Sequence, residues 1–190
     1  MSTTSIMIVG VGGQGSLLAS KLLGRVLTAE DYDVKVSEVH GMSQRGGSVV
    51  TYVRFGDKVY SPIVDAGEAD FIVSFEKLEA ARYVSNLKIG GKIIVNSQQI
   101  DPMPVITGAA TYPTEVLNTL REKGAEVQEM DALTLAMEAG SSKAVNIVLM
   151  GRLARYLGIP EEKWIAAIET TVNPAFVELN KKAFALGYNG

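Results

Sequence analysis

The sequence predicts a single α/β domain: a Rossmann-like, mostly parallel sheet with an inserted β-hairpin and a helical C-terminal tail. Apolar runs typical of strands buried on both faces alternate with helical patterns over the first 100 residues. A glycine-rich turn follows the first run, and the last third of the chain shows mostly helical periodicity. The 190 residues are enough for one sizeable core, and no repeat, low-complexity tract or charge block indicates a linker.

The first strand, helix and second strand follow one another closely. Residues 6–9 form a continuous apolar run that ends at Gly10. Residues 14–28 carry leucines and a valine at helical spacing, and residues 34–39 predict the second strand. Such a βαβ unit is expected to have a right-handed crossover.

Two further apolar runs, residues 71–75 and 93–95, predict central parallel strands. Residues 76–84 between them predict a helix, with Gly90-Gly91 as its exit turn. The sequence therefore continues the alternation of strand and helix after the second strand.

An antiparallel hairpin is expected to interrupt this alternation. Its predicted strands are residues 48–55 and residues 58–60. The Gly56-Asp57 pair between them suits a type II′ turn. The hairpin is inserted after the second strand.

The second half of the chain is predicted to be mostly helical, with a last strand at residues 127–130. Pro160 and Pro174 stand where the start of a helix tolerates a missing N–H group. One helix is apolar nearly all round, so it is buried either inside the domain, which is the default, or under a partner. The predicted helices cover residues 113–123, 144–157 (the apolar one), 161–171 and 174–186.

The composition excludes several classes of function. Eighteen Lys and Arg against 21 Asp and Glu give a net charge of −3, which provides no basic footprint for nucleic acid. No Cys is present and only one His, so the chain cannot supply disulfides, Cys-ligated iron–sulfur clusters or a multi-His metal site. No apolar stretch approaches membrane-spanning length, and no basic region precedes the first apolar run, so we expect a cytoplasmic protein.

The strongest local motif is Gly10-Val11-Gly12-Gly13-Gln14-Gly15, which follows the first predicted strand and opens a helix. In this G-x-G-x-x-G pattern the glycines allow a tight turn, close approach of a phosphate and close helix packing. Free N–H groups and the helix dipole favour an anion there. Glu38 lies where a ribose-binding carboxylate belongs. The candidate cofactor-binding residues of this motif are Gly10, Gly12, Gly13, Gln14, Gly15 and Glu38.

A packing role for these glycines, without any nucleotide, is an equal alternative. Two details count against NAD in particular. Gln14 places a long polar side chain beside the turn, and Glu38 is followed by what resembles an organised loop.

That loop, residues 37–48, is the second motif. It is dense in glycines and hydrogen-bond donors and leaves the carboxyl end of a strand, where open α/β sheets bind ligands. Arg45 is flanked by Ser43-Gln44 and Gly46-Gly47, a setting suited to bidentate capture of a carboxylate or phosphate. The further candidate cofactor-binding residues are therefore Ser43, Gln44, Arg45, Gly46 and Gly47.

Other polar residues have simpler interpretations. Arg45 could instead tie its loop to a neighbouring carboxylate. His40 stands without a triad around it and is interpreted as a hydrogen-bonded loop residue, so no residue is assigned a catalytic role. Ser141-Ser142-Lys143 and Asn146, at the start of the apolar helix, are interpreted as N-capping residues.

Together, the motifs at residues 10–15 and 37–47 resemble the gamma-type domain of 2-oxoacid:ferredoxin oxidoreductases (the pyruvate/ketoisovalerate oxidoreductase gamma type). The resemblance covers residues 1–190 as one domain, and overall likeness favours the small (beta) subunits of the indolepyruvate type. It implies an accessory subunit of a complex that decarboxylates a 2-oxoacid on thiamine diphosphate, passes electrons through iron–sulfur clusters to ferredoxin, and forms acyl-coenzyme A.

The resemblance also implies where the cofactors reside. Without Cys, and without a Gly-Asp-Gly pattern resembling a thiamine diphosphate site, this chain is expected to leave both cofactors to a larger partner subunit. Its own loops would face either that partner or the phosphates of coenzyme A. Isolated from the partner, the chain is expected to form a homo-oligomer, because exposed apolar faces seek burial.

Two other functions stay open on the residues alone. The glycine motif and Glu38 are compatible with a free-standing, Rossmann-type, nucleotide-dependent oxidoreductase. A scaffold module whose loop binds no ligand is the third possibility.

Overall fold

In the described part of the chain, six strands form one mixed sheet in the order β2-β3-β1-β4-β5-β6. The computed structural model describes residues 3–40 and 46–190. The pairs β1/β4, β4/β5 and β5/β6 are parallel, whereas β3 runs antiparallel to both β1 and β2. The predicted Rossmann-like α/β class is confirmed. The strands are β1 (Thr4–Val11), β2 (Asp33–His40), β3 (Ser48–Gly56), β4 (Ala69–Ser74), β5 (Leu87–Asn96) and β6 (Glu126–Met130).

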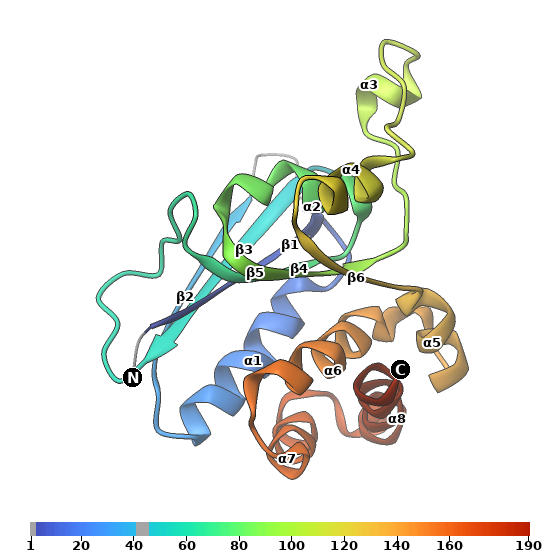
Figure 1. Ribbon diagram of the computed structural model, residues 1–190. Helices are drawn as coiled ribbons and strands as arrows, with labels where there is room; N and C mark the ends of the chain where they lie inside the picture. Colours follow the sequence, from blue (N-terminus) through green and yellow to red (C-terminus); the bar gives the residue numbers. More distant parts are fainter. Residues whose placement is uncertain (1–2, 41–45) are drawn as a thin grey trace.

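Helices cover both faces of the sheet (Figure 1). One face carries α1 and the C-terminal helices, and the other carries α2 and α4. The short helix α3 lies in an arm, between β5 and α4, that projects from the body of the domain (Figure 1). The helices are α1 (Ser16–Ala29), α2 (Lys77–Arg82), α3 (Met103–Ile106), α4 (Val116–Glu122), α5 (Ala132–Ala139), α6 (Val145–Leu157), α7 (Glu161–Thr171) and α8 (Val177–Asn189). The 3₁₀ turns of the described residues are η1 (Val84–Asn86), η2 (Ser142–Ala144) and η3 (Pro174–Phe176).

The first strand shows why its apolar run is continuous. Ile6 and Ile8 pack in the larger core, under α1 and the C-terminal helices, while Met7 and Val9 pack in the smaller core under α2 and α4. All four side chains are fully buried. A strand covered on both faces needs apolar residues at every position, as the sequence predicts.

The hairpin differs from its prediction. β3 pairs with β2 along its whole length and lies between β1 and β2, whereas residues 58–60 form no strand. The segment after β3 is held by side chains instead. The Val59 amide donates to the Asp33 carboxylate at 3.0 Å, and the Arg54 guanidinium donates to the Ile63 carbonyl at 2.7 Å.

The glycine pair at 90–91 was predicted as an exit turn, which is wrong. Both residues lie inside β5, at a shift in the β4/β5 register between Ala69 and Phe71. A Cβ atom on Gly91 would stand 2.9 Å from the carbonyl oxygen of Ala69, so the close approach of the two strands requires glycine there. The turn after α2 is the 3₁₀ turn Val84–Asn86.

The C-terminal tail matches its predicted helices to within a few residues, and α6 is the buried helix inside the domain. Nine of its residues are buried, and it packs chiefly against α8. The two backbones touch at Gly187, where an added Cβ would lie 1.9 Å from the Val148 carbonyl oxygen. The helices α3 and α5 were not predicted.

Candidate functional site

The glycine turn joins the carboxyl end of β1 to α1, and the side chain of Gln14 folds back over it. The Val11 amide donates to Oε1 of Gln14 at 2.7 Å, and Nε2 of Gln14 donates to the Phe75 carbonyl at 3.3 Å. A Cβ atom on Gly10 would stand 2.8 Å from the Gln14 oxygen. The first glycine of the motif therefore leaves room for Gln14, which ties the turn to the end of β4.

The last glycine of the motif serves helix packing. Gly15 has a φ of 89° and precedes α1. Asn146 of α6 is almost fully buried, and its Nδ2 donates to the Gly15 carbonyl at 3.2 Å. Asn146 is thus a contact between α6 and the glycine turn, beyond the capping role expected from the sequence. Ser141 does cap: its hydroxyl accepts a bond from the Lys143 amide at 3.3 Å.

The two sequence motifs meet at their backbones. The Gly12 amide donates to the Gly47 carbonyl at 2.8 Å, and the Gly46 amide donates to the Gly12 carbonyl at 3.3 Å. This pair of bonds seats the end of the second loop on the glycine turn. Ser43, Gln44 and Arg45 lie outside the described residues.

Two hollows flank the glycine turn at the carboxyl edge of the sheet. The first, of about 410 Å³, brings Gly12, Gly13 and Gly15 together with Glu38 and His40. The second, of about 520 Å³, is lined by the turn and by α6. Gln14, Gln98, Lys143 and Asn146 are among its lining residues. The structure thus gathers Glu38 with three of the glycines and places Gln14 on the other side.

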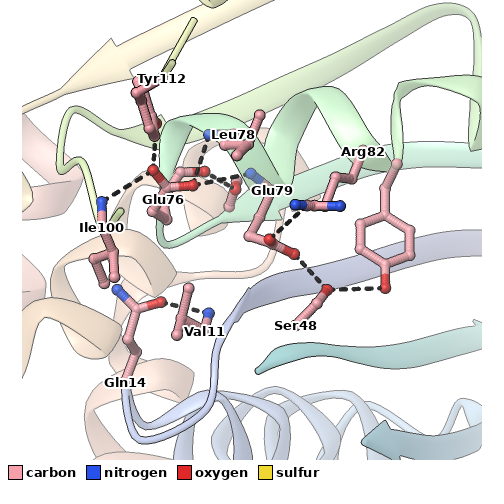
Figure 2. A network of polar contacts seen from close by, with 11 residues as sticks. Val11, Gln14, Ser48, Glu76, Leu78, Glu79, Arg82, Ile100 and Tyr112 are labelled. Atoms are coloured by element: carbon pink, nitrogen blue, oxygen red, sulfur yellow. Dashed lines mark hydrogen bonds and ion pairs between the residues drawn. The ribbon is translucent and has the colours of Figure 1, made fainter. Parts of the chain in front are cut away.

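Sequence analysis missed a buried carboxylate that follows β4. Glu76 is 1% exposed and caps α2, accepting bonds from the amides of Leu78 and Glu79 at 2.6 and 3.0 Å. Its second oxygen accepts bonds from the Ile100 amide at 3.2 Å and from the Tyr112 hydroxyl. Figure 2 shows both partners converging on it. Burial is the main cause that raises the pKa of Tyr112, and its hydrogen bond to Glu76 raises that pKa further, so the hydroxyl remains a donor.

A second missed carboxylate, Glu79, lies one turn further on. It is 5% exposed, accepts a bond from the Ser48 hydroxyl and pairs with Nε of Arg82 at 2.9 Å (Figure 2). Burial raises the pKa of Glu79, the nearby Glu76 charge raises it further, and Ser48 and Arg82 oppose the shift. Glu79 anchors the start of β3 beside the second loop. Glu76 directly follows the apolar run at residues 71–75 and Glu79 comes three residues later, a position that marks them as candidates without showing their partners.

The described residues contain no group of three or more His, Asp or Glu side chains placed to hold a metal ion. Within the same part of the chain, no helix is long and apolar enough to cross a membrane. The two hollows beside the glycine turn offer backbone N–H groups, amide side chains and Lys143, together with Glu38 and His40.

A mixed sheet with a glycine turn after its first strand, and with hollows at its carboxyl edge, defines a Rossmann-like α/β domain. The sequence model of the family "Pyruvate ferredoxin/flavodoxin oxidoreductase" matches residues 5–190, and the chain belongs to this family.

Relatives with known names extend the match over nearly the whole chain. "Indolepyruvate oxidoreductase subunit IorB" of Thermococcus kodakarensis is 46% identical, covering 98% of this chain and 95% of the relative. "Pyruvate/ketoisovalerate oxidoreductases common subunit gamma" of Thermococcus litoralis is 28% identical, covering 91% of this chain and 87% of that subunit.

Solved structures share the fold. The gamma subunit of a keto/oxoacid ferredoxin oxidoreductase from Geobacter sulfurreducens superposes with a TM-score of 0.73 at 24% identity, over 98% of this chain and 96% of that one. The 2-oxoglutarate:ferredoxin oxidoreductase of Magnetococcus marinus, solved with 2-oxoglutarate, coenzyme A and succinyl-CoA bound, gives 0.75 at 17% identity. There, all of this chain corresponds to 31% of a longer chain.

Proposed function

We propose that this chain is the small, accessory subunit of an indolepyruvate-type 2-oxoacid:ferredoxin oxidoreductase. The observation that carries the proposal is the 46% identity to an indolepyruvate oxidoreductase subunit across nearly the full length of both chains. Identity to the pyruvate/ketoisovalerate gamma subunits is much lower, at 28%. The difference favours the indolepyruvate type within the family.

The redox chemistry then belongs to a larger partner subunit. Thiamine diphosphate supplies decarboxylation of the 2-oxoacid, and the iron–sulfur clusters carry the electrons to ferredoxin. A chain without Cys has no thiolates for such clusters. This subunit contributes surfaces that complete the assembly.

We assign the glycine turn and the second loop to the surfaces that complete the assembly. Gly13 and Gly46 both have positive φ, and among the described residues, their chain neighbours aside, no atom lies within 4 Å of the Cβ position of either one. Their backbones are therefore open to close approach by another group. The predicted residues Gly10, Gly12, Gly13, Gln14, Gly15, Glu38, Ser43, Gln44, Arg45, Gly46 and Gly47 stay candidates for contact with either the partner or the phosphates of coenzyme A.

The sheet order disfavours a free-standing dinucleotide enzyme. In a dinucleotide-binding Rossmann domain, the ribose-binding carboxylate follows a strand adjacent to the glycine strand. Here β3 lies between β1 and β2, so the β2 strand that carries Glu38 is about 10 Å from β1, twice the ordinary strand spacing.

Co-expression with a large thiamine diphosphate- and cluster-binding subunit from the same organism tests the proposal. We expect a brown heteromer that oxidises indolepyruvate in the presence of coenzyme A and reduces ferredoxin. The chain expressed alone should be colourless and inactive. Substantial dye reduction by the purified single chain, with no partner detectable by mass spectrometry, would contradict the proposal and favour the free-standing enzyme.

Arg45→Ala tests the second loop. A surface-loop substitution normally changes stability by less than about 0.5 kcal/mol, so the melting temperature should hardly change. Assembly or the dependence on coenzyme A should weaken. Arg25→Ala, in α1, is the matched control and should leave both unchanged. A large loss of stability with normal assembly would assign Arg45 to folding instead.

A further inference from the structure

The projecting arm, residues 100–112, exposes apolar side chains away from the body of the domain (Figure 1). None of the 4 residues of its helix α3 is buried. Met103 is 66% exposed and Ile106 is 65% exposed. Exposed apolar residues that gather on one projecting element mark an interaction surface.

Charged side chains are nearly absent from this arm. Asp101 is the one charged residue between Ile100 and Tyr112, although 21% of the chain is charged. Most of the other residues are Met, Ile, Val, Pro or Ala. The buried centre of a protein interface is depleted of charge and enriched in methionine in the same way. We propose that the arm inserts α3 into an apolar groove of the large partner subunit, an inference that rests on the proposed function.

The arm holds its shape through its own hydrogen bonds before any contact is made. The Ile106 amide donates to the Pro102 carbonyl at 3.1 Å. The Ala110 amide donates to the Pro104 carbonyl at 2.9 Å, and both prolines have a fixed φ. The carboxylate of Glu76 binds the two ends of the arm. An element that is ordered in advance loses less conformational entropy on binding, so the arm is suited to docking as a preformed unit.

The base of the arm adjoins the surface that we assign to assembly. Gln98, just before the arm, accepts a hydrogen bond from Nε2 of Gln14 at 3.4 Å. Both side chains line the hollow of about 520 Å³ beside the glycine turn. The strands β1, β4 and β5 are parallel, so the glycine turn and the arm leave the sheet at the same carboxyl edge. One partner surface can therefore contact both.

The size of the arm favours the partner subunit over a second copy of this chain. A stable interface needs roughly 20–30 residues on each side. Residues 100–112 alone are fewer than that, so a symmetric contact between two arms does not make a stable dimer. Together with the glycine turn and the second loop, the same residues extend one continuous surface for a larger partner.

Competition during assembly provides the test. Wild-type and variant chains are co-expressed with the tagged large subunit, and mass spectrometry measures the ratio in which the purified heteromer contains them. Ile106→Lys should be incorporated about tenfold less than wild type or lower still, because it places an unpaired charge in an apolar groove. Ile89→Lys is the matched control, since Ile89 is 101% exposed at the amino end of β5, and it should be incorporated as well as wild type. Both isolated variants should keep the wild-type melting temperature, because both side chains are exposed.

A cross-linking measurement identifies the occupant of the arm. With p-benzoyl-phenylalanine in place of Ala109, irradiation of the heteromer should join the arm to the large subunit. Absence of that cross-link, or a cross-link to a second copy of this chain, would overturn the inference. Equal incorporation of Ile106→Lys and wild type, or an equal loss with Ile89→Lys, would overturn it as well.

The same experiment separates this inference from the proposed function. An active heteromer that assembles equally well with the Ile106→Lys chain would refute the role of the arm and leave the proposed function intact. A wild-type chain that forms no heteromer with the large subunit would contradict both.

Discussion

The side-chain amide of Asn146 donates to the carbonyl of Gly15 at 3.2 Å, although 131 residues separate the two in sequence. This bond joins α6 to the turn that precedes α1. It makes the last glycine of the G-x-G-x-x-G motif part of the domain's internal packing. The motif therefore has a structural function that does not depend on a bound ligand.

Comparison of Gly15→Ala with Gly13→Ala separates backbone strain from packing. Both glycines have positive φ, at 89° and 105°, so each alanine should lose about 1–2 kcal/mol of stability from strain. A Cβ at position 15 would also stand 2.8 Å from Nδ2 of Asn146, whereas position 13 has open space. Urea denaturation should show Gly15→Ala to be the more destabilised by about 1–3 kcal/mol, the effect of disrupting a buried hydrogen bond. Equal losses would show that the Asn146 contact contributes nothing.

A double-mutant cycle isolates that contact. In an Asn146→Ala background, the alanine at position 15 no longer meets an amide nitrogen. In that background, Gly15→Ala should lose only as much stability as backbone strain costs in Gly13→Ala. The double-mutant cycle should then give a coupling energy of about 1 kcal/mol or more. A coupling energy of zero would refute the assignment of Asn146.

The carboxylate of Glu76 binds both ends of the projecting arm between β5 and α4. It accepts bonds from Ile100, where the arm leaves the body, and from Tyr112, where it returns. Tyr112→Phe should therefore destabilise the chain by about 1–2 kcal/mol, because an acceptor stays buried without one of its donors. Hydrogen exchange at the Ile100 amide should accelerate, while Tyr60→Phe, on an 89% exposed side chain, should change neither quantity. Unchanged exchange at Ile100 would show that the two ends of the arm are held independently.

Much of the fold could be predicted because its signals are local. A strand buried on both faces needs apolar residues throughout, and Ile6, Met7, Ile8 and Val9 meet that requirement. The hairpin could not be predicted in the same way. Residues 48–55 mix apolar residues with Ser48, Thr51 and Arg54, and nothing local fixes the direction or the neighbours of β3. The Gly56-Asp57 pair favoured the wrong partner strand.

The residues of the candidate site also fall into those that the sequence predicted and those that it did not. The glycine turn and Glu38 were found from spacing, and the structure places them around one hollow. Glu76 and Glu79 were missed because their roles depend on partners far along the chain. Tyr112 is 36 residues from Glu76, and Ser48 is 31 residues from Glu79. Binding at any of the predicted site residues stays a prediction.

Glu79 should make the stability of the chain depend on pH. Because burial raises its pKa in the folded state, the native chain binds more protons than the unfolded chain between the ordinary carboxylate pKa and the folded one. The free energy of unfolding that Glu79 contributes is therefore largest at low pH and falls as pH rises through that window. Glu79→Gln removes this titration, so the stability of the variant relative to wild type should increase as pH rises from 4 to 8.

Urea denaturation at several pH values measures this difference, and Glu122→Gln, on the exposed side of α4, corrects for the loss of one surface charge. Ser48→Ala gives an independent check. The Ser48 hydroxyl lowers the pKa of Glu79, so its removal should raise that pKa and extend the fall in stability to higher pH. A difference between wild type and Glu79→Gln that is constant with pH would show that Glu79 titrates as it does in the unfolded chain, and that its burial beside Glu76 is fully offset by Ser48 and Arg82.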